Sequence, residues 1–235
     1  MILKVKEVIH YTESLFKIRV SRPPDFHFKA GQFTMIGLPS SDVQRAYSIA
    51  SSPLSEDLEF YSIKVPSGEF TSKLSSICVG DELEVGGYPT GTLLPTSLCS
   101  GKHLWLLATG TGIAPFMSLI REGEIFSHYK EVELLWSVRY KEELSAYESE
   151  LKASGVKFHP IVTRSPQSEY DSIRIDKQIS SLLSTNSLNS EESRVMVCGN
   201  MDFNKAIREM LLSNNFKEGS RKQPGDFVLE RAFVS

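Results

Sequence analysis

Arg45-Ala46-Tyr47-Ser48 closes a strand-like stretch, and Ile49-Ala50-Ser51-Ser52-Pro53 follows it and stops at a proline. The two-residue period of a strand places Arg45 and Tyr47 on the same face. A guanidinium group offers fixed donors to the paired oxygens of a diphosphate, and a tyrosine ring offers a flat surface for a heterocycle. A flavin dinucleotide requires both features. For these residues in isolation, an exposed arginine beside a half-buried tyrosine on a barrel strand is the plainer alternative.

The first part of the chain is typical of short strands separated by turns. Apolar or alternating runs occur at residues 3–10, 15–20, 32–38, 45–50, 58–65 and 82–85. Six strands at this spacing predict a small antiparallel β-barrel. A short helix is predicted over 71–77, with a hydroxyl residue at its start as N-cap. Its free N–H groups near Thr71 and Ser72 would form a second anion site, unless the stretch is only a capping turn.

The pattern changes at His103. A continuous apolar run at 104–108 leads into Thr109-Gly110-Thr111-Gly112 and then into a helical pattern at 116–121. Further strands are predicted at 132–138, 156–163 and 194–198, and they alternate with helices at 142–153, 176–183 and 202–213. This alternation predicts a parallel, doubly wound α/β sheet. We therefore expect a barrel domain over 1–97 and an α/β domain over 98–235, with the linker around 88–102.

The ends of the predicted parallel strands indicate which nucleotide is bound. Pro115 stands where a dinucleotide fingerprint has its third glycine, and proline is acceptable in the first turn of a helix. An NAD-selective fold would place Asp or Glu after the next strand. This chain has Arg139-Tyr140 there, Arg164 after the following strand and Arg174 before the next helix. Three arginines at one edge predict a 2′-phosphate and hence NADP(H), with exposed strand and helix caps as the alternative.

Two stretches near the C-terminus are further candidates for a ligand site. Cys198-Gly199-Asn200-Met201 ends a strand, and its glycine would let a ligand approach the backbone. Cys198 is either an ordinary buried cysteine or a small polarizable group packed against a nicotinamide ring. Residues 224–235 are typical of a last strand that ends in Phe233. A terminal aromatic side chain is usually packed or frayed, but this one could lie over a flavin.

The composition excludes several classes of protein. The chain has 235 residues, of which 40% are hydrophobic and 23% are charged, and this composition is ordinary for a globular protein. Its net charge of −3 argues against a nucleic-acid binder. Cys78, Cys99 and Cys198, like the five histidines, show no metal-ligand spacing, so no metal is expected. Scattered cysteines favour a reducing compartment. With no signal peptide or membrane span apparent, the cytoplasm is the expected location and no membrane contact is expected.

Basic residues are in excess near the N-terminus. They are Lys4, Lys6, Lys17, Arg19, Arg22 and Lys29, against the acidic residues Glu7, Glu13 and Asp25. This excess is consistent with a docking patch for an acidic partner protein. A solvated barrel face is the slightly favoured alternative.

Together these stretches resemble the ferredoxin–NADP reductase superfamily, and most closely its bacterial ferredoxin/flavodoxin–NADP reductases. The resemblance covers essentially the whole chain, and it rests on residues 45–48, 59–65, 68, 70–72, 108–115, 198–200 and 230–234. It implies an N-terminal six-stranded β-barrel that binds FAD and a C-terminal α/β domain that binds NADP(H). A monomer is expected.

The resemblance also implies roles for individual residues. The implied FAD set is Arg45, Ala46, Tyr47, Ser48, Tyr61, Ile63, Lys64, Val65, Gly68, Phe70, Thr71, Ser72, Thr111, Ala232 and Phe233. The implied NADP set is Gly110, Gly112, Arg139, Tyr140, Arg164, Arg174, Gly199, Asn200 and Met201. The implied catalytic residues are Ser48, Cys198 and Glu230, which would surround the site of hydride transfer. The tail with Ala232 and Phe233 would cover the flavin and would have to move during turnover.

The implied activity is that of an oxidoreductase that takes or gives a hydride at NADP(H) and passes single electrons to or from a ferredoxin or flavodoxin. A free-flavin reductase, or the reductase component of an oxygenase, is the first alternative. The missing cysteine cluster argues against an electron-transfer subunit of a larger complex, and against a fused oxygenase reductase. A nucleotide-binding module without redox activity is the last alternative, and such a protein would lack flavin absorption.

Overall fold

The computed structural model describes residues 1–39, 41–165 and 170–231, without the side chain of residue 231. A six-stranded sheet occupies the N-terminal part, in the order β4-β3-β6-β1-β2-β5. Its strands are β1 (Ile2–His10), β2 (Leu15–Ser21), β3 (Phe33–Gly37), β4 (Gln44–Ser48), β5 (Asp57–Ile63) and β6 (Glu82–Val85). All of their pairings are antiparallel. A bridge between Ile49 and Phe60 joins the two edge strands, so the predicted antiparallel barrel is confirmed.

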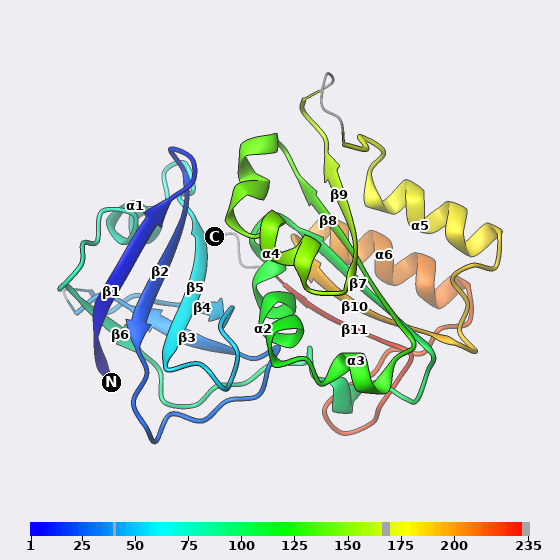
Figure 1. Cartoon of the computed structure of the whole chain (residues 1–235), viewed down its shortest axis with the longest axis horizontal. Helices are drawn as coiled ribbons and strands as arrows, with labels where there is room; N and C mark the ends of the chain where they lie inside the picture. Colours follow the sequence, from blue (N-terminus) through cyan, green and yellow to red (C-terminus); the bar gives the residue numbers. More distant parts are fainter. Residues whose placement is uncertain (40, 166–169, 232–235) are drawn as a thin grey trace.

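The interior of the barrel follows from alternation along its strands. Leu58 and Phe60 of β5 are fully buried in one apolar cluster with Ile18 and Val20 of β2. Along β5, Glu59 and Tyr61 therefore point to the opposite face, as the pleat of a strand requires. That face lies toward the second half of the chain (Figure 1).

The short helix at the end of the barrel differs from its prediction. Helix α1 spans Glu69–Leu74, its N-cap is Gly68, and no side chain caps it. The hydroxyl of Thr71 instead accepts a hydrogen bond from the Val65 amide at 3.0 Å and donates to the Gly68 carbonyl at 3.3 Å. The predicted N-cap at 71 is therefore wrong, because this hydroxyl closes the preceding turn. The Ser72 amide is already bonded to the Gly68 carbonyl, so it is no free anion donor.

The second sheet has five strands in the order β11-β10-β7-β8-β9. They are β7 (His103–Thr109), β8 (Glu131–Val138), β9 (Lys157–Val162), β10 (Ser193–Gly199) and β11 (Phe227–Arg231). All four pairings are parallel. The central strands β7 and β10 are buried on both faces, which explains their continuous apolar runs.

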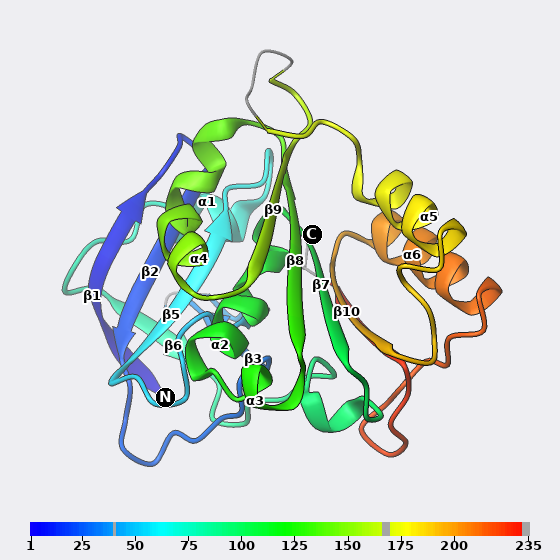
Figure 2. The ribbon, with the colours of Figure 1, turned by 45° about the vertical axis from the view of Figure 1, so that its right-hand side comes forward.

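Helices cover both faces of this sheet (Figure 2). One face carries η2 (Gly110–Ile113), α2 (Ala114–Glu122), α3 (Ile125–His128), η3 (Lys141–Ala146) and α4 (Glu148–Ala153), and the other carries α5 (Ile175–Ser184) and α6 (Met201–Ser213). The predicted doubly wound α/β sheet is therefore confirmed. A further 3₁₀ turn, η1, spans Pro95–Ser97. Within the described residues, none of these helices has the length and apolarity needed to cross a bilayer.

One predicted helix is divided. The single helix expected over 142–153 is interrupted at Tyr147, whose φ of −139° is not helical, and η3 and α4 lie on either side. The Tyr147 ring is fully buried between the sheet and the barrel. Burial of this ring at the interface therefore coincides with the break in the helix.

The two sheets are connected by a segment that contacts both. Thr90 bridges to Phe33 of the barrel, while Leu98 bridges to Gly225 just before β11. The sheets account for residues 2–85 and 103–231, and the exact boundary between 97 and 98 stays a prediction.

Candidate functional site

A first cavity of about 760 Å³ opens beside β4 and β5 of the barrel. Most of the residues predicted for FAD line it, namely Arg45, Ala46, Tyr47, Ser48, Tyr61, Ile63, Val65, Gly68, Phe70, Thr71 and Thr111. Lys64 lines the second cavity instead, and Ser72 lines neither of the two. Ala232 and Phe233 lie outside the described residues. Sequence reasoning missed Ser41, Val43, Ser62, Pro66, Ser67, Glu69, Lys73 and Ala114, most of which flank predicted residues in the chain.

Strand β4 contributes all four motif residues, 45–48, to the lining of the first cavity. Arg45 is exposed, and one guanidinium nitrogen donates to the neighbouring Gln44 carbonyl at 3.0 Å. The Tyr47 hydroxyl lies 3.0 Å from the Ser62 hydroxyl across the cavity wall. Burial raises the pKa of Tyr47, although the bond to Ser62 and the charge of Arg45 oppose the rise. The phenol therefore stays neutral, and a flat neutral ring and a cation line the same cavity.

The turn between β5 and α1 forms the other wall. A side chain at Gly68 would place its Cβ 2.7 Å from the Thr71 hydroxyl oxygen and 3.2 Å from the Val65 carbonyl. The next residue back, Ser67, has a positive φ of 63°. The turn is therefore tight, and it leads directly into Phe70 and Thr71, which also line the cavity.

A second cavity of about 1150 Å³ lies at the carboxyl ends of the parallel strands. This edge is where open α/β sheets bind their ligands. The predicted NADP residues that line it are Gly110, Arg139, Arg164, Arg174 and Asn200. Gly112, Tyr140, Gly199 and Met201 do not line it: the two glycines are buried, whereas Tyr140 and Met201 are exposed.

The predicted arginines are brought together, but with acidic neighbours. Arg139 lies 3.5 Å from Glu143, and Arg174 lies 3.0 Å from Asp176. The Arg164 amide donates to the Arg139 carbonyl at 2.8 Å, which fixes two of the arginine backbones side by side. Glu143 and Asp176 also line the cavity, and no sequence signal pointed to either of them.

The two cavities adjoin. Five residues border both of them, and these are Tyr61, Ile63, Val65, Pro66 and Thr111. The Tyr61 hydroxyl donates across the interface to the Glu143 carbonyl at 3.2 Å, and the ring is almost fully buried. Burial raises the pKa of Tyr61 well above its ordinary value, so this hydroxyl keeps its proton. A ligand in the first cavity can thus reach a ligand in the second over this shared wall.

The predicted catalytic residues fall into two groups. Ser48 lines the first cavity, whereas Cys198 and Glu230 lie opposite each other on β10 and β11 and border neither cavity. The Glu230 carboxylate accepts from the Thr92 amide at 2.7 Å and from the Thr92 hydroxyl at 3.1 Å. Burial raises the pKa of Glu230, while Thr92 and the charge of Arg221 oppose the rise. Thr92 lies in the predicted linker, where no sequence signal pointed to it.

Cys198 keeps its proton in this setting. Burial raises the pKa of its thiol well above the ordinary value, and the nearby Glu230 adds to the rise. The residue is therefore a neutral packing group rather than a thiolate. Among the described residues, no group of three or more His, Cys, Asp or Glu side chains could hold a metal ion.

The basic N-terminal residues do not form the free patch that their number suggested. Lys17 is buried and lies 3.4 Å from the Glu59 carboxylate, so its inclusion in a docking surface is wrong. Arg19 shares that carboxylate and also contacts Glu7. Two of the others are paired as well, Lys4 with Glu82 and Lys6 with Asp57. The sequence analysis counted Lys17 among the docking residues, but Tyr147 of the second half of the chain lies beside it.

Comparisons with known proteins agree with this geometry. Residues 1–94 match the family model of the oxidoreductase FAD-binding domain, and residues 106–209 match that of the oxidoreductase NAD-binding domain. The chain is 40% identical to a flavodoxin/ferredoxin–NADP reductase of Rhodobacter capsulatus, over 98% of this chain and 92% of the relative. It is also 40% identical to a ferredoxin–NADP reductase of Pseudomonas aeruginosa, over 98% and 96%.

A solved structure gives the same result. The fold is similar to that of a ferredoxin NADP⁺ reductase from Neisseria gonorrhoeae with bound FAD and NADP, with a TM-score of 0.91, 30% identity, and coverage of 99% of this chain and 98% of the other. The two family models together cover most of the chain, and the relatives align over nearly its whole length. This chain therefore belongs to the ferredoxin–NADP reductase family.

Proposed function

We propose that this chain is an FAD-dependent oxidoreductase that exchanges electrons between NADP(H) and a one-electron carrier protein, a ferredoxin or a flavodoxin. The observation that carries the proposal is the pair of adjoining cavities with Tyr61 and Thr111 in their common wall. A hydride can pass only between rings in contact, so the two cofactor sites must share a boundary. The relatives and the solved structure named above support the same activity.

The first cavity fits FAD by the chemistry of its lining. Arg45 would hold the pyrophosphate, because a guanidinium group gives several donors in a fixed geometry. Tyr47 would stack against the isoalloxazine, and its bond to Ser62 holds the ring in place for that contact. Ser48, which lines the same cavity, would lie near the reactive nitrogen of the flavin.

The second cavity fits NADP(H) by its three arginines. Arg139, Arg164 and Arg174 would hold the 2′-phosphate, and the N-terminus of α6 beside Asn200 would face the nucleotide. When bound, the two cofactors supply the redox chemistry, namely hydride exchange between nicotinamide and flavin and one-electron exchange with the carrier. The chain itself binds and orients them.

Cys198 and Glu230 would lie behind the place of hydride transfer, since neither residue borders a cavity. Cys198 would be a neutral, compact packing group there, and Glu230 has a carboxyl group whose raised pKa favours holding a proton. Thr92 fixes that carboxyl group by two hydrogen bonds. The roles predicted for Ala232 and Phe233 stay predictions, because both residues lie outside the described part of the chain.

The partner, the oligomeric state and the location are proposed more broadly. The electron carrier would dock on the barrel where Arg22 and Lys29 add positive charge, without the buried Lys17. We propose a monomer that does not bind nucleic acid, consistent with the net charge of −3. The free thiols of Cys78, Cys99 and Cys198 suit a reducing compartment such as the cytoplasm.

Stopped-flow absorption of the purified protein tests the proposal. The isolated protein should be yellow, and NADPH should bleach its flavin much faster than NADH at equal concentration. A panel of ferredoxin, flavodoxin and free flavin should then show preference for a carrier protein. A colourless protein, or a flavin that NADPH does not reduce, would contradict the proposed function. Preference for free flavin would instead identify a flavin reductase.

A further inference from the structure

Strand β5 is the structural element shared by the two cavities. Leu58 and Phe60 point into the barrel core, and Ser62 lines the first cavity. Tyr61 and Ile63 border both cavities. Two residues before Tyr61, on the same side of the strand, lies the buried carboxylate of Glu59, which is 3% exposed. Whatever holds Glu59 therefore also holds the wall between the cavities.

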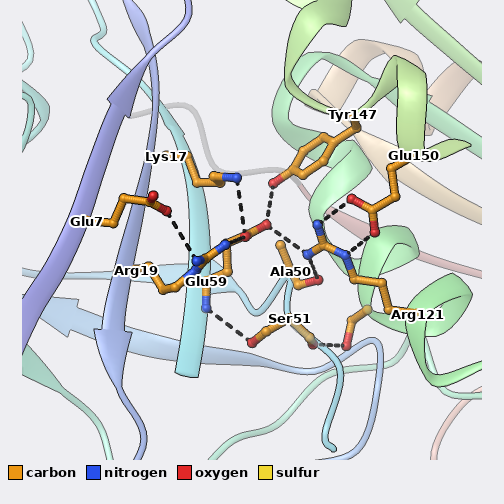
Figure 3. A network of polar contacts seen from close by, with 10 residues as sticks. Glu7, Lys17, Arg19, Ala50, Ser51, Glu59, Arg121, Tyr147 and Glu150 are labelled. Carbon is orange, nitrogen blue, oxygen red and sulfur yellow. Dashed lines mark hydrogen bonds and ion pairs between the residues drawn. The ribbon is translucent and has the colours of Figure 1, made fainter. Parts of the chain in front are cut away.

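The two oxygens of the Glu59 carboxylate bond to different halves of the molecule (Figure 3). Its Oε1 accepts from Arg121 at 2.8 Å and from the Tyr147 hydroxyl at 3.1 Å, both in the α/β half. Its Oε2 lies 3.4 Å from Lys17 and 3.3 Å from Arg19, both on β2 of the barrel. The carboxylate is thus the point where the two halves are joined by charge.

Helix α2 is attached to the barrel at more than this point. Arg121 also donates to the Ala50 carbonyl at 2.8 Å, and its other nitrogens bind Glu150 at 2.6 and 2.7 Å. One turn earlier, the Ser118 hydroxyl donates to the Ser51 carbonyl at 2.7 Å, and both residues are buried. These bonds fix the second half of α2 against the chain that runs from β4 to β5 (Figure 3).

The first half of α2 leads directly into the site. The helix begins at Ala114, which lines the first cavity, and it follows the turn with Thr111, which borders both. Arg121 lies seven residues farther on, or about 10 Å along a rigid helix at 1.5 Å per residue. The bonds of Arg121 therefore fix the position of the glycine turn relative to β5.

We propose that Glu59, Arg121 and Tyr147 are positioning residues for hydride transfer. They border neither cavity, and they act by fixing how the nucleotide half sits against the flavin half, so that the nicotinamide meets the isoalloxazine in the reactive geometry. The inference rests on the proposed function. A displacement of about 1 Å is enough to slow a transfer that depends on aligned rings, by as much as roughly a hundredfold.

The chemistry of a carboxylate is necessary for this role. A carboxylate accepts at both oxygens, so it can serve donors on two sides at once. The amide of a Glu59→Gln variant has nearly the same size but accepts at only one end. Its NH₂ group must face either Arg121 or the pair of Lys17 and Arg19, and these three cations can only donate. The variant thus breaks the connection on one side without removing the packing.

The experiment measures alignment separately from binding. In Glu59→Gln, the rate constant of flavin reduction at saturating NADPH should fall about tenfold or more, while the Kd values of FAD and 2′-phospho-AMP stay within about twofold. The long-wavelength charge-transfer absorption of the reduced protein with saturating NADP⁺, in which the reduced flavin is the electron donor, should weaken in parallel. Tyr147→Phe removes one hydrogen bond and keeps the ring, so it should show the same effects to a smaller degree. It also decides the question if Glu59→Gln does not fold.

Asp226→Asn is the matched control. It disrupts the pair of Arg194 and Asp226, which are 3.5 Å apart and also buried. Both residues belong to the α/β half, at β10 and just before β11, so this pair does not join the two halves. It should lower stability and leave the rate and the charge-transfer band unchanged. Unchanged rates in Glu59→Gln and Tyr147→Phe, or an equal loss in the control, would overturn the positioning role alone. Failure of NADPH to reduce the wild-type flavin would instead overturn the proposed function.

Discussion

At the scale of single residues, the arginines of the second cavity decide which pyridine nucleotide is bound. Arg174 is well exposed, so its contact with Asp176 contributes little and can be exchanged for a phosphate. We expect Arg174→Ala and Arg164→Ala each to weaken binding of 2′-phospho-AMP by roughly 1.5–3 kcal/mol, the range of hydrogen bonds to charged groups. Binding of AMP should not change. Titration calorimetry with the two nucleotides measures the difference.

Arg208 supplies the control for this prediction. It lies on α6, is also exposed and is paired with Glu218 at 2.7 Å, but it does not line the cavity. Arg208→Ala should leave the affinities of both nucleotides unchanged. Equal losses for AMP and 2′-phospho-AMP in the Arg164 and Arg174 variants would show that these arginines do not read the 2′-phosphate.

A second prediction at this scale concerns the carboxyl group of Glu230. Its pKa is raised in the folded protein by burial, so the folded state binds more protons than the unfolded state between the two pKa values. Stability therefore falls as pH rises from the ordinary pKa of about 4.3 through the raised one. Thr92 opposes this loss by donating to the carboxylate. Thr92→Val should thus destabilise the protein more at about pH 8 than at about pH 5.

Chemical denaturation at the two pH values measures this difference. The single proton of the Thr92 hydroxyl is shared between Glu230 and the Leu229 carbonyl, which lies 2.9 Å away. The part of this interaction that goes to Leu229 is lost in the variant at both pH values. The groups that face Glu230 are Cys198 on β10 and Arg221, and neither changes in the variant. Thr92→Ser should restore the wild-type dependence. A destabilisation that is equal at both pH values would contradict the assigned role.

At the scale of elements, the sequence predicts what depends on neighbours along the chain. The alternation of Leu58 to Ser62 and the apolar run of Leu104 to Ala108 predicted strands in the two correct kinds of sheet. The start of α1 was misplaced because a hydroxyl can close a turn as well as cap a helix, and Thr71 does the former. The break at Tyr147 follows burial against the barrel, which no local pattern contains.

The glycine turn between β7 and α2 allows a prediction that separates two glycines. A Cβ at Gly112 would lie 2.2 Å from the Cys198 carbonyl oxygen, so the turn packs directly on the backbone of β10. Gly110 has a φ of +53° and open space around it. Gly112→Ala should therefore cost about 3 kcal/mol or more by overpacking. Gly110→Ala should cost only roughly 1–2 kcal/mol of backbone strain. Urea unfolding of the two variants compares them, and equal losses would contradict the close approach.

At the scale of the whole molecule, the sequence could name the two halves but not how they are joined. Glu59 and Arg121 are 62 residues apart, and each is a common type of charged residue in its own element. Lys17 and Arg19 read as an exposed basic pair until the fold brings Glu59 beside them. The motif residues around Tyr47 lie within β4, and Arg139 and Arg164 follow the ends of β8 and β9, so both sets could be predicted from the local sequence. The shared wall at Tyr61 depends on the contact between the halves, so only the structure reveals it.

The Glu59 carboxylate, which joins the two halves, makes the stability of the whole molecule depend on pH. Burial alone would raise the pKa of Glu59, but Arg121 and Lys17 outweigh it, so that the pKa is lowered in the folded protein. Arg19 and the Tyr147 hydroxyl face the same carboxylate. The contribution of this group to stability is therefore complete above the unfolded pKa of about 4.3, and it is lost as pH falls through the lowered pKa of the folded state.

Glu59→Gln should be less stable than wild type at about pH 7, and the difference should shrink toward about pH 3. Glu150→Gln, which alters the exposed partner of Arg121, should show a smaller difference at neutral pH. A gap between Glu59→Gln and wild type that stays constant across this range in urea unfolding would show that the carboxylate does not join the halves by its charge.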